Sequence, residues 1–268
     1  MIRNLVPVVL VAVCLQFLSS PAAANDTELT NGGTPKALNG NTTVSMRREY
    51  VKMVIGEKWV TVDCRFTFRN RGPARLVRMG FPDEGGDPGE DPDAQPKTPK
   101  GTFTTFQSWV NGRPVRTRVI KSAEPGSVWH EKMVQFPAYG TLEVRDRYTV
   151  EVGSSVAFSP LSARLARYVL HTGASWQGNI GRSEIEVVFQ RKSVPSPIAV
   201  KRMPEIDSRG RPEGNQSFEM RSLYYEGPST PTVMGKTLRF VRTNWRPTKS
   251  DDILLLFDLS RPKTISVP

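Results

Sequence analysis

The feature that most constrains the fold is a ten-residue stretch of strict alternation from Val60 to Arg69. Apolar and polar side chains exchange at every position of this stretch. Successive side chains of a β-strand point to opposite faces, so the pattern predicts a strand with one face buried and the other in water. Cys64 lies in the inward register, between Val62 and Phe66, which predicts a small buried side chain rather than a reactive thiolate.

Composition agrees with a chain of many short elements. The 268 residues include 22 Pro and 21 Gly spread along the sequence, and 38% are hydrophobic. These values exclude collagen, a coiled coil, a multispan membrane protein and full disorder. They leave room for one large domain or two small ones.

Further short runs repeat the strand signal. Asn111-Gly112 favours a tight turn because both residues tolerate positive φ, so we expect a hairpin between 103–110 and 115–120. The spacing of these runs predicts an all-β protein, a β-sandwich or two packed β-lobes. The remaining predicted strands are 50–55, 76–81, 128–136, 142–152, 184–190, 218–225, 238–241 and 253–259.

One segment has the character of a helix. Ser159-Pro160 suits a helix start, and Leu161, Leu165 and Val169 have helical spacing. We therefore expect at most one short helix, over about 160–167, leading into a strand at 168–171.

The first 24 residues predict a secretory signal peptide. Arg3 supplies the positive start, 5–18 is apolar, and Ala22 to Ala24 offer small residues for cleavage near Ala24. The apolar stretch is short for a spanning helix. We therefore expect a soluble exported protein, periplasmic or extracellular, with no transmembrane segment.

The rest of the chain divides by composition. Residues 25–43 are polar and rich in Gly and Asn, which predicts a flexible N-terminal arm. The β-sandwich body is expected over 44–260, followed by a C-terminal tail at 261–268. Within the body, 83–100 combines acids, Pro and Gly and predicts a long solvated loop. Calcium binding by its carboxylates is an open alternative.

The sequence offers no recognised catalytic or metal-binding pattern. It contains no H-E-x-x-H, C-x-x-C, EF-hand or G-x-S-x-G string, and Cys64 is the single cysteine after the predicted cleavage. We therefore predict no catalytic residue, no metal, no cofactor and no internal disulfide. Glu184 and Glu186 share a strand face; they are either a solvated outer face or a carboxylate pair for glycoside hydrolysis.

Four residues are candidates for ligand binding. Each of the two histidines is either a structural residue with one hydrogen bond or a general base beside a carboxylate. Exposed Trp rings stack on sugars, although such rings more often pack at sheet edges. The candidates are Trp129, His130, His171 and Trp176.

Positive charge is strong but diffuse. Lys and Arg exceed Asp and Glu by 37 − 26 = 11. For an exported protein the expected anions are envelope polysaccharides, teichoic acid or lipid headgroups, or the partner is another envelope protein. No sequence signal for nucleic-acid binding is present, and the oligomeric state is not indicated.

Several strings resemble a known family. They are Phe106-x2-Trp109-Val110-Asn111-Gly112, Thr172-Gly173-Ala174-x-Trp176-x-Gly178-x-Ile180-Gly181 and Asn244-Trp245-x-Pro247. Together they are similar to a bacterial exported family known only as a domain of unknown function. The resemblance covers about residues 44 to 259. It implies an immunoglobulin-like, β-rich exported protein and carries over no catalytic residue.

Two functions follow as hypotheses. The first is a non-enzymatic binding or structural protein at the bacterial envelope, because the chain combines a leader, a β pattern and no catalytic constellation. The alternative is an envelope-acting hydrolase in which His130 or His171 assists a carboxylate.

Overall fold

A computed structural model describes residues 27–28, 31–40, 43–84, 101–123, 127–158, 161–206, 212 and 217–260. In these residues the chain forms strands and two short 3₁₀ helices, η1 (His171–Ser175) and η2 (Lys249–Asp251). The strands are β1 (Thr27–Glu28), β2 (Asn31–Gly33), β3 (Lys36–Ala37), β4 (Val44–Ile55), β5 (Trp59–Asn70), β6 (Arg75–Glu84), β7 (Thr105–Val110), β8 (Arg113–Val115), β9 (Arg118–Lys121), β10 (Ser127–Phe136), β11 (Thr141–Glu151), β12 (Gly153–Phe158), β13 (Leu161–Val169), β14 (Ile180–Phe189), β15 (Val200–Arg202), β16 (Leu223–Glu226), β17 (Thr232–Met234), β18 (Thr237–Trp245) and β19 (Ile253–Ser260).

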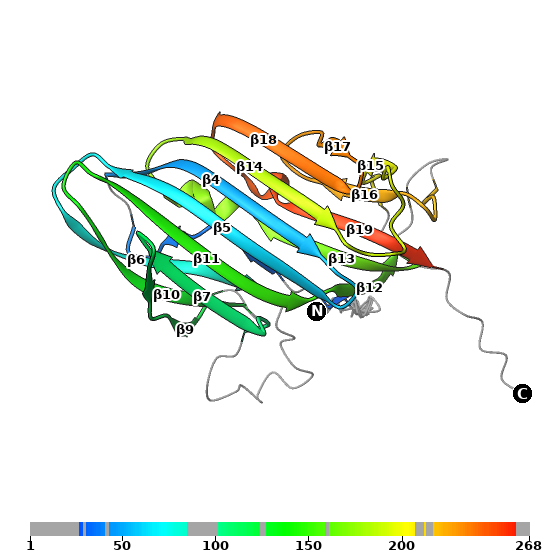
Figure 1. The fold of residues 1–268 in the computed structure, drawn as a ribbon, viewed down its shortest axis with the longest axis horizontal. Coiled ribbons are helices and arrows are strands. Elements are labelled where there is room, and N and C mark those ends of the chain that lie inside the picture. Colours follow the sequence, from blue (N-terminus) through cyan, green and yellow to red (C-terminus); the bar gives the residue numbers. More distant parts are fainter. Residues whose placement is uncertain are drawn as a thin grey trace, which may run out of the picture.

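The strands form two sheets that pack on each other, which confirms the all-β sandwich. Sheet B has the order β17-β18-β14-β4-β5-β11-β7-β8, and Figure 1 shows its long strands side by side in front of the other sheet. Sheet A has the order β15-β16-β19-β13-β2-β6-β10-β9, with β1, β3 and β12 attached at its sides. Both sheets are mixed: β4 and β14 run parallel in sheet B, as do β2 and β13 in sheet A.

The alternating stretch becomes the centre of sheet B. Strand β5 lies between β4 and β11, and its inward residues are fully buried while its outward residues are exposed or half-buried. Cys64 is among the buried residues, as predicted, and burial raises the pKa of its thiol well above the usual value. A buried neutral thiol is a packing group and not a nucleophile.

Aromatic rings join the two sheets along the length of the sandwich. Phe68 of β5 meets Phe136 of β10 edge to face, with ring centres 5.8 Å apart. Phe189 of β14 meets Phe257 of β19 in the same way at 5.4 Å. Because such contacts occur at both ends, one continuous apolar core spans the two sheets. A smaller apolar cluster around Leu256 lies apart from it.

The expected flexible arm over 25–43 is wrong for residues 31–37. Strand β2 inserts into sheet A between β13 and β6, and β3 pairs with β6. The glycines that made this segment look loose are needed for close packing. A Cβ at Gly32 would collide with the Tyr148 ring, and one at Gly33 with Val169.

The expected helix over 160–167 is also wrong. Residues Leu161–Val169 form β13, which pairs with β12, β19 and β2. Positions four apart share a face in a helix, but they share a face in a strand as well, so the spacing of Leu161, Leu165 and Val169 did not separate the two. In the part of the chain that the structure describes, the helical turn nearest to this segment is η1, which follows the strand.

The predicted hairpin turn at Asn111-Gly112 is confirmed. Both residues have positive φ, 49° and 75°, and the turn joins β7 to β8. The two strands after the turn belong to different sheets, however: β8 pairs in sheet B, and β9 pairs with β10 in sheet A.

Parts of the predicted organisation lie outside the described residues. These are the leader at 1–24, the tail at 261–268 and positions 85–100 of the acidic loop. The first two residues of that loop, Asp83 and Glu84, instead end strand β6, and Asp83 is buried. Within the described part of the chain, no helix has the length and apolar character that crossing a membrane requires.

A buried ion pair connects the sheets. Lys132 of β10 donates to both carboxylate oxygens of Asp146 of β11, at 2.5 and 2.7 Å, and neither side chain has any exposed surface. Burial lowers the pKa of Lys132, while the Asp146 charge opposes that shift. Asp146 is the one break in the inward apolar register of its strand, and Lys132 is the group that makes this break tolerable.

We predict that Lys132→Met lowers the free energy of unfolding by about 3–5 kcal/mol, because it leaves an uncompensated buried carboxylate. Urea unfolding measures this loss. The double variant Lys132→Met, Asp146→Leu should recover much of it, since both charges are then gone. The control is Lys52→Met, which breaks the exposed pair with Glu186 and should cost below about 1 kcal/mol. Equal losses for the two single variants would contradict the account.

Candidate functional site

The four predicted ligand-binding residues do not form one site. Trp129 and His130 lie on β10, His171 begins η1, and Trp176 follows it. The two histidines each pair with a different aspartate, and neither lines either of the two pockets described below.

His130 packs beside two aromatic rings. Its Nε2 lies 2.9 Å from Oδ2 of Asp83, and its ring stacks on Phe106 at 4.2 Å and on Phe103 at 5.1 Å. Asp83 also accepts hydrogen bonds from the backbone N–H and hydroxyl of Thr102, at 2.9 and 2.7 Å. The pair therefore fastens the chain around 102 to strand β6.

His171 has a similar partner. Its Nδ1 lies 2.9 Å from Oδ2 of Asp252, which also accepts from the backbone N–H of Leu170 at 2.7 Å and of His171 at 3.0 Å. Arg167 donates to the same carboxylate at 3.1 Å. Asp252 thus closes the junction between β13 and η1, and its acceptor positions are taken by groups of the protein itself.

Neither of the two predicted tryptophans is fully exposed. Trp176 is buried, its Nε1 donates to the Pro35 carbonyl at 2.7 Å, and its ring centre lies 4.5 Å from that of Phe68. Trp129 is half-buried; it packs where a Cβ at Gly80 would fall, and the Lys36 ammonium lies 5.7 Å from its ring centre. Trp176 is an anchor of the core.

Glu184 and Glu186 lie on the outward face of β14, which favours the solvated-face interpretation. Glu184 accepts hydrogen bonds from Arg182 and Arg239 at 2.9 and 2.8 Å. Burial alone would raise the pKa of Glu184, but these two guanidinium groups outweigh it and lower the pKa. A carboxyl held ionised in this way is unsuited to act as the general acid of a glycosidase.

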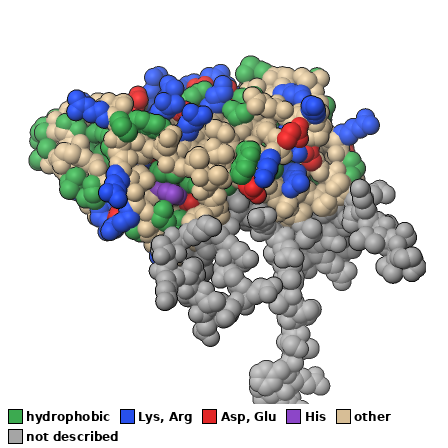
Figure 2. All heavy atoms as spheres, turned by 60° about the horizontal axis from the view of Figure 1, so that its bottom comes forward, with side chains coloured by type: hydrophobic (Ala, Val, Ile, Leu, Met, Phe, Trp, Pro, Cys, Tyr) green, Lys and Arg blue, Asp and Glu red, His purple; other side chains and the backbone are tan. Residues whose placement is uncertain are grey.

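Charge is spread over the molecule. Figure 2 shows Lys and Arg side chains scattered over the visible face, with acidic side chains among them. Among the described residues, no group of three or more His, Cys, Asp and Glu side chains could hold a metal ion. An anionic ligand needs a hollow whose cationic side chains are not already paired with acidic side chains.

One hollow fits that description, and we call it the arginine cleft. It lies where the first residues of β4 and β14 meet the end of β18, and its volume is about 640 Å³. Among the described residues, no acidic side chain lines it. Its lining residues are Ser45, Arg47, Arg71, Gln177, Gly178, Asn179, Gly181 and Asn244.

A bulge presents Arg47 to this cleft. The register between β4 and β5 shifts between Met46 and Arg48, so Arg47 is the extra residue, and bulges of this kind redirect a side chain. Opposite it, a Cβ at Gly181 would lie 2.5 Å from the backbone oxygen of Arg47. Gly181 therefore lets β14 pass close to the bulged strand.

Arg71 is placed by a turn that a buried amide fixes. The Asn70 side chain donates to the carbonyls of Pro73 and Pro137, at 2.7 and 2.9 Å, and accepts from the Thr43 hydroxyl at 2.6 Å. The next residue, Arg71, is exposed at the cleft. Among the described residues, neither Arg47 nor Arg71 has a side-chain partner, so both guanidinium groups remain available.

The third wall is the segment after η1. Trp176 and Ile180 are buried and anchor it, while Gln177, Gly178 and Asn179 are exposed between them. The Asn179 amide donates to the Asn244 carbonyl at 3.1 Å, which ties this wall to β18. The Trp176-x-Gly178-x-Ile180-Gly181 string of the sequence thus builds a cleft wall.

The sequence patterns did not predict the arginine cleft. The string pointed to this wall, but Arg47 and Arg71 are two of many basic residues and carry no local signal. Only the register shift in β4 and the turn after β5 bring them beside Gln177, and both depend on pairing between distant strands.

Comparison with known proteins adds evidence on the fold. A solved structure from Legionella pneumophila, provisionally named a nutrient binding protein, matches with a TM-score of 0.63 at 19% identity. The match covers 87% of this chain and 73% of that one, so the two share a fold. An M1 zinc metallopeptidase from Deinococcus radiodurans matches with a TM-score of 0.36 and 13% identity. This match covers 81% of our chain but 43% of the peptidase, less than half its length.

No model of a known protein family matches the chain, and no curated protein matches it. The comparisons therefore establish the architecture and no family membership.

Proposed function

We propose that the chain is an exported, non-enzymatic binding protein of the bacterial envelope, and that it binds an acidic polysaccharide at the arginine cleft. The observation that carries the proposal is a hollow that two unpaired guanidinium groups line and that no acidic side chain of the described residues lines. A guanidinium presents a planar fork of donors that matches a carboxylate.

The rest of the lining favours a sugar over a bare anion or a lipid. Gln177, Asn179 and Asn244 carry amides and Ser45 a hydroxyl, which exchange hydrogen bonds with sugar hydroxyls. Lipid tails would need apolar surface, and the side chains that line this cleft are polar or absent. The volume of about 640 Å³ is in the range of pockets that hold small ligands.

Two predictions from the sequence support export: the leader at 1–24 and the resemblance to an exported bacterial family. The provisional name of the Legionella pneumophila neighbour is in keeping with a binding role. An exported basic protein meets anionic glycans of the envelope, which makes them the expected partners.

The hydrolase alternative meets one of its geometric requirements, because both histidines lie within hydrogen-bond distance of a carboxylate. Both carboxylates, however, also hold backbone N–H groups in place. Each histidine–aspartate pair therefore has a structural role, since it holds two segments of the chain together. Neither pair lines the arginine cleft or the second pocket, which contains Leu223.

Binding should depend on the two cleft arginines. Arg47→Gln and Arg71→Gln should each weaken binding of polygalacturonate about tenfold, the value of one charge-assisted hydrogen bond. Binding should also weaken from low to high salt, and neutral dextran should not bind. Calorimetric titration of the purified mature chain measures all three.

The matched control is Arg202→Gln, an exposed arginine on β15 outside the cleft, which should bind as the unaltered protein does. Equal losses for all three arginine variants would show that attraction is spread over the surface. Such a result, or binding that ignores salt, would refute the cleft as the site.

The clamp role of Asp252 predicts an acid-dependent loss of stability. Burial alone would raise the pKa of Asp252, but hydrogen bonds from His171 and from two backbone N–H groups outweigh it and lower the pKa. A lowered folded pKa gives stability that is complete above the unfolded pKa of about 3.9 and is lost as pH falls through the folded value.

Asp252→Asn should therefore cost about 1–3 kcal/mol at pH 7 and should remove this part of the acid dependence. Urea unfolding from pH 2 to pH 7 measures both effects. Glu226→Gln, at an exposed position of β16, is the control and should change neither. Full stability of Asp252→Asn at neutral pH would argue against a clamp and in favour of a free acid–base pair.

A further inference from the structure

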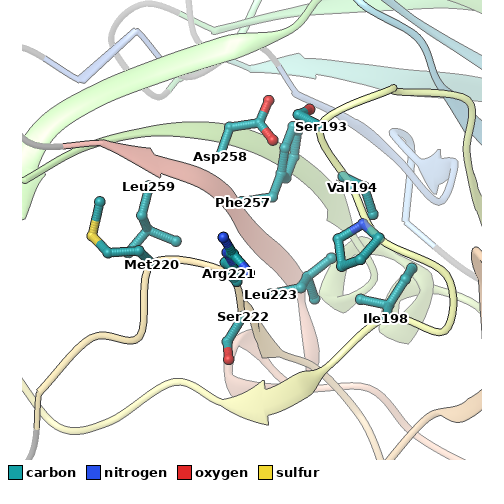
Figure 3. Close-up of a pocket in the computed structure, with 11 residues that line it drawn as sticks. Ser193, Val194, Ile198, Met220, Arg221, Ser222, Leu223, Phe257, Asp258 and Leu259 are labelled. Atoms are coloured by element: carbon teal, nitrogen blue, oxygen red, sulfur yellow. The ribbon is translucent and has the colours of Figure 1, made fainter.

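A second pocket lies at the end of β19, and we call it the apolar pocket. Its volume is about 290 Å³. Three segments line it: 193–198, 220–223 and the end of β19 at 257–259. Figure 3 shows side chains from all three segments facing the same space.

The interior of this pocket is aliphatic and aromatic. Val194, Ile198, Leu223, Phe257 and Leu259 line it, and all five are buried residues. Most ligand pockets have this composition, with a few polar groups that fix orientation. A volume of about 290 Å³ is at the small end of the usual range, which favours a medium-chain ligand over a long one.

A bulge in β19 lies at this pocket and contains Asp258, the acidic residue of its lining. The pairing of β13 with β19 shifts between Ser162 and Arg164, and Asp258 has a φ of 49°. Asp258 accepts from Nε of Arg191 at 2.8 Å, and Arg191 is itself buried and donates to two carbonyls of the β4–β5 turn. The charge of Asp258 is therefore already neutralised.

Arg221 is the cation that remains. It lines the pocket, is exposed, and has no hydrogen-bond or ion-pair partner among the described residues. In Figure 3 it lies between Met220 and Leu259 on one side and Leu223 on the other, away from Asp258. The pocket thus combines an apolar interior with one uncommitted positive charge.

We propose that the apolar pocket binds a medium-chain aliphatic carboxylate, with the alkyl chain against Leu223 and Phe257 and the carboxylate on Arg221. Burial of the chain supplies affinity at about 25 cal/mol per Å² of apolar surface removed from water. The guanidinium fork supplies orientation and selects an anion. This site is separate from the arginine cleft, so either proposal can fail alone.

The test is calorimetric titration of the folded protein at neutral pH with decanoate as the probe. Decan-1-ol has the same chain length without the charge, and acetate has the charge without the chain. Decanoate should bind; decan-1-ol should bind about tenfold more weakly, because it loses one charge-assisted hydrogen bond; acetate should show no binding.

Two variants and one control locate the site. Arg221→Gln should weaken decanoate binding about tenfold and leave decan-1-ol unchanged. Ser193→Trp should block both, because the ring fills the pocket from an exposed rim position. Arg147→Gln, on the outward face of β11, should bind decanoate normally.

Three results would overturn the proposal: no decanoate binding to the unaltered protein, equal binding by Arg221→Gln, or binding that survives Ser193→Trp. The substituted positions are exposed, and unfolding curves establish that the variants keep their fold.

Discussion

The constraint on which the structure depends is that its long strands must bury a row of apolar side chains between two sheets. Strand β5 shows it most plainly. Its inward residues are buried, and it pairs with β4 on one side and β11 on the other. Buried carboxyl groups interrupt this rule, among them Glu49 of β4 and Asp146 of β11. Asp146 occupies an inward position, and Lys132 from the opposite sheet must be present to neutralise it. The pair joins β10 of sheet A to β11 of sheet B through two hydrogen bonds.

Features that interrupt the ladders build the two hollows. The bulge at Arg47 turns a guanidinium out of sheet B, and the bulge at Asp258 opens the end of β19 in sheet A. In the first hollow the charge stays uncommitted, because no acid lines it. In the second the acid is already paired with Arg191, and the free cation is Arg221. Regular pairing makes the body of the molecule, and irregular pairing makes its candidate sites.

Period-two patterns in the sequence were sufficient to predict the fold class and several of the long strands. They predicted β5 and β11, because burial on one face leaves alternating side chains in the sequence. The Asn111-Gly112 turn was predicted separately, from the tolerance of both residues for positive φ. The patterns failed at 161–169, where residues four apart share a face in either secondary structure, and at 31–37, where glycine is required by close contact with Tyr148 and Val169. The sites were beyond reach for another reason. Arg47 and Arg71 come to one cleft through pairings between distant strands. The predicted His130 and His171 each lie beside an aspartate, and Trp176 packs in the core.

The central claim of our proposal is that the β-sandwich binds an acidic glycan at the arginine cleft. Hydrogen–deuterium exchange with and without polygalacturonate tests this most directly, because it reports every backbone segment at once. Protection confined to the segments around Arg47, Arg71 and 177–181 is the predicted result. Protection spread along the outward faces of β11 and β14, or centred on His130, would contradict it.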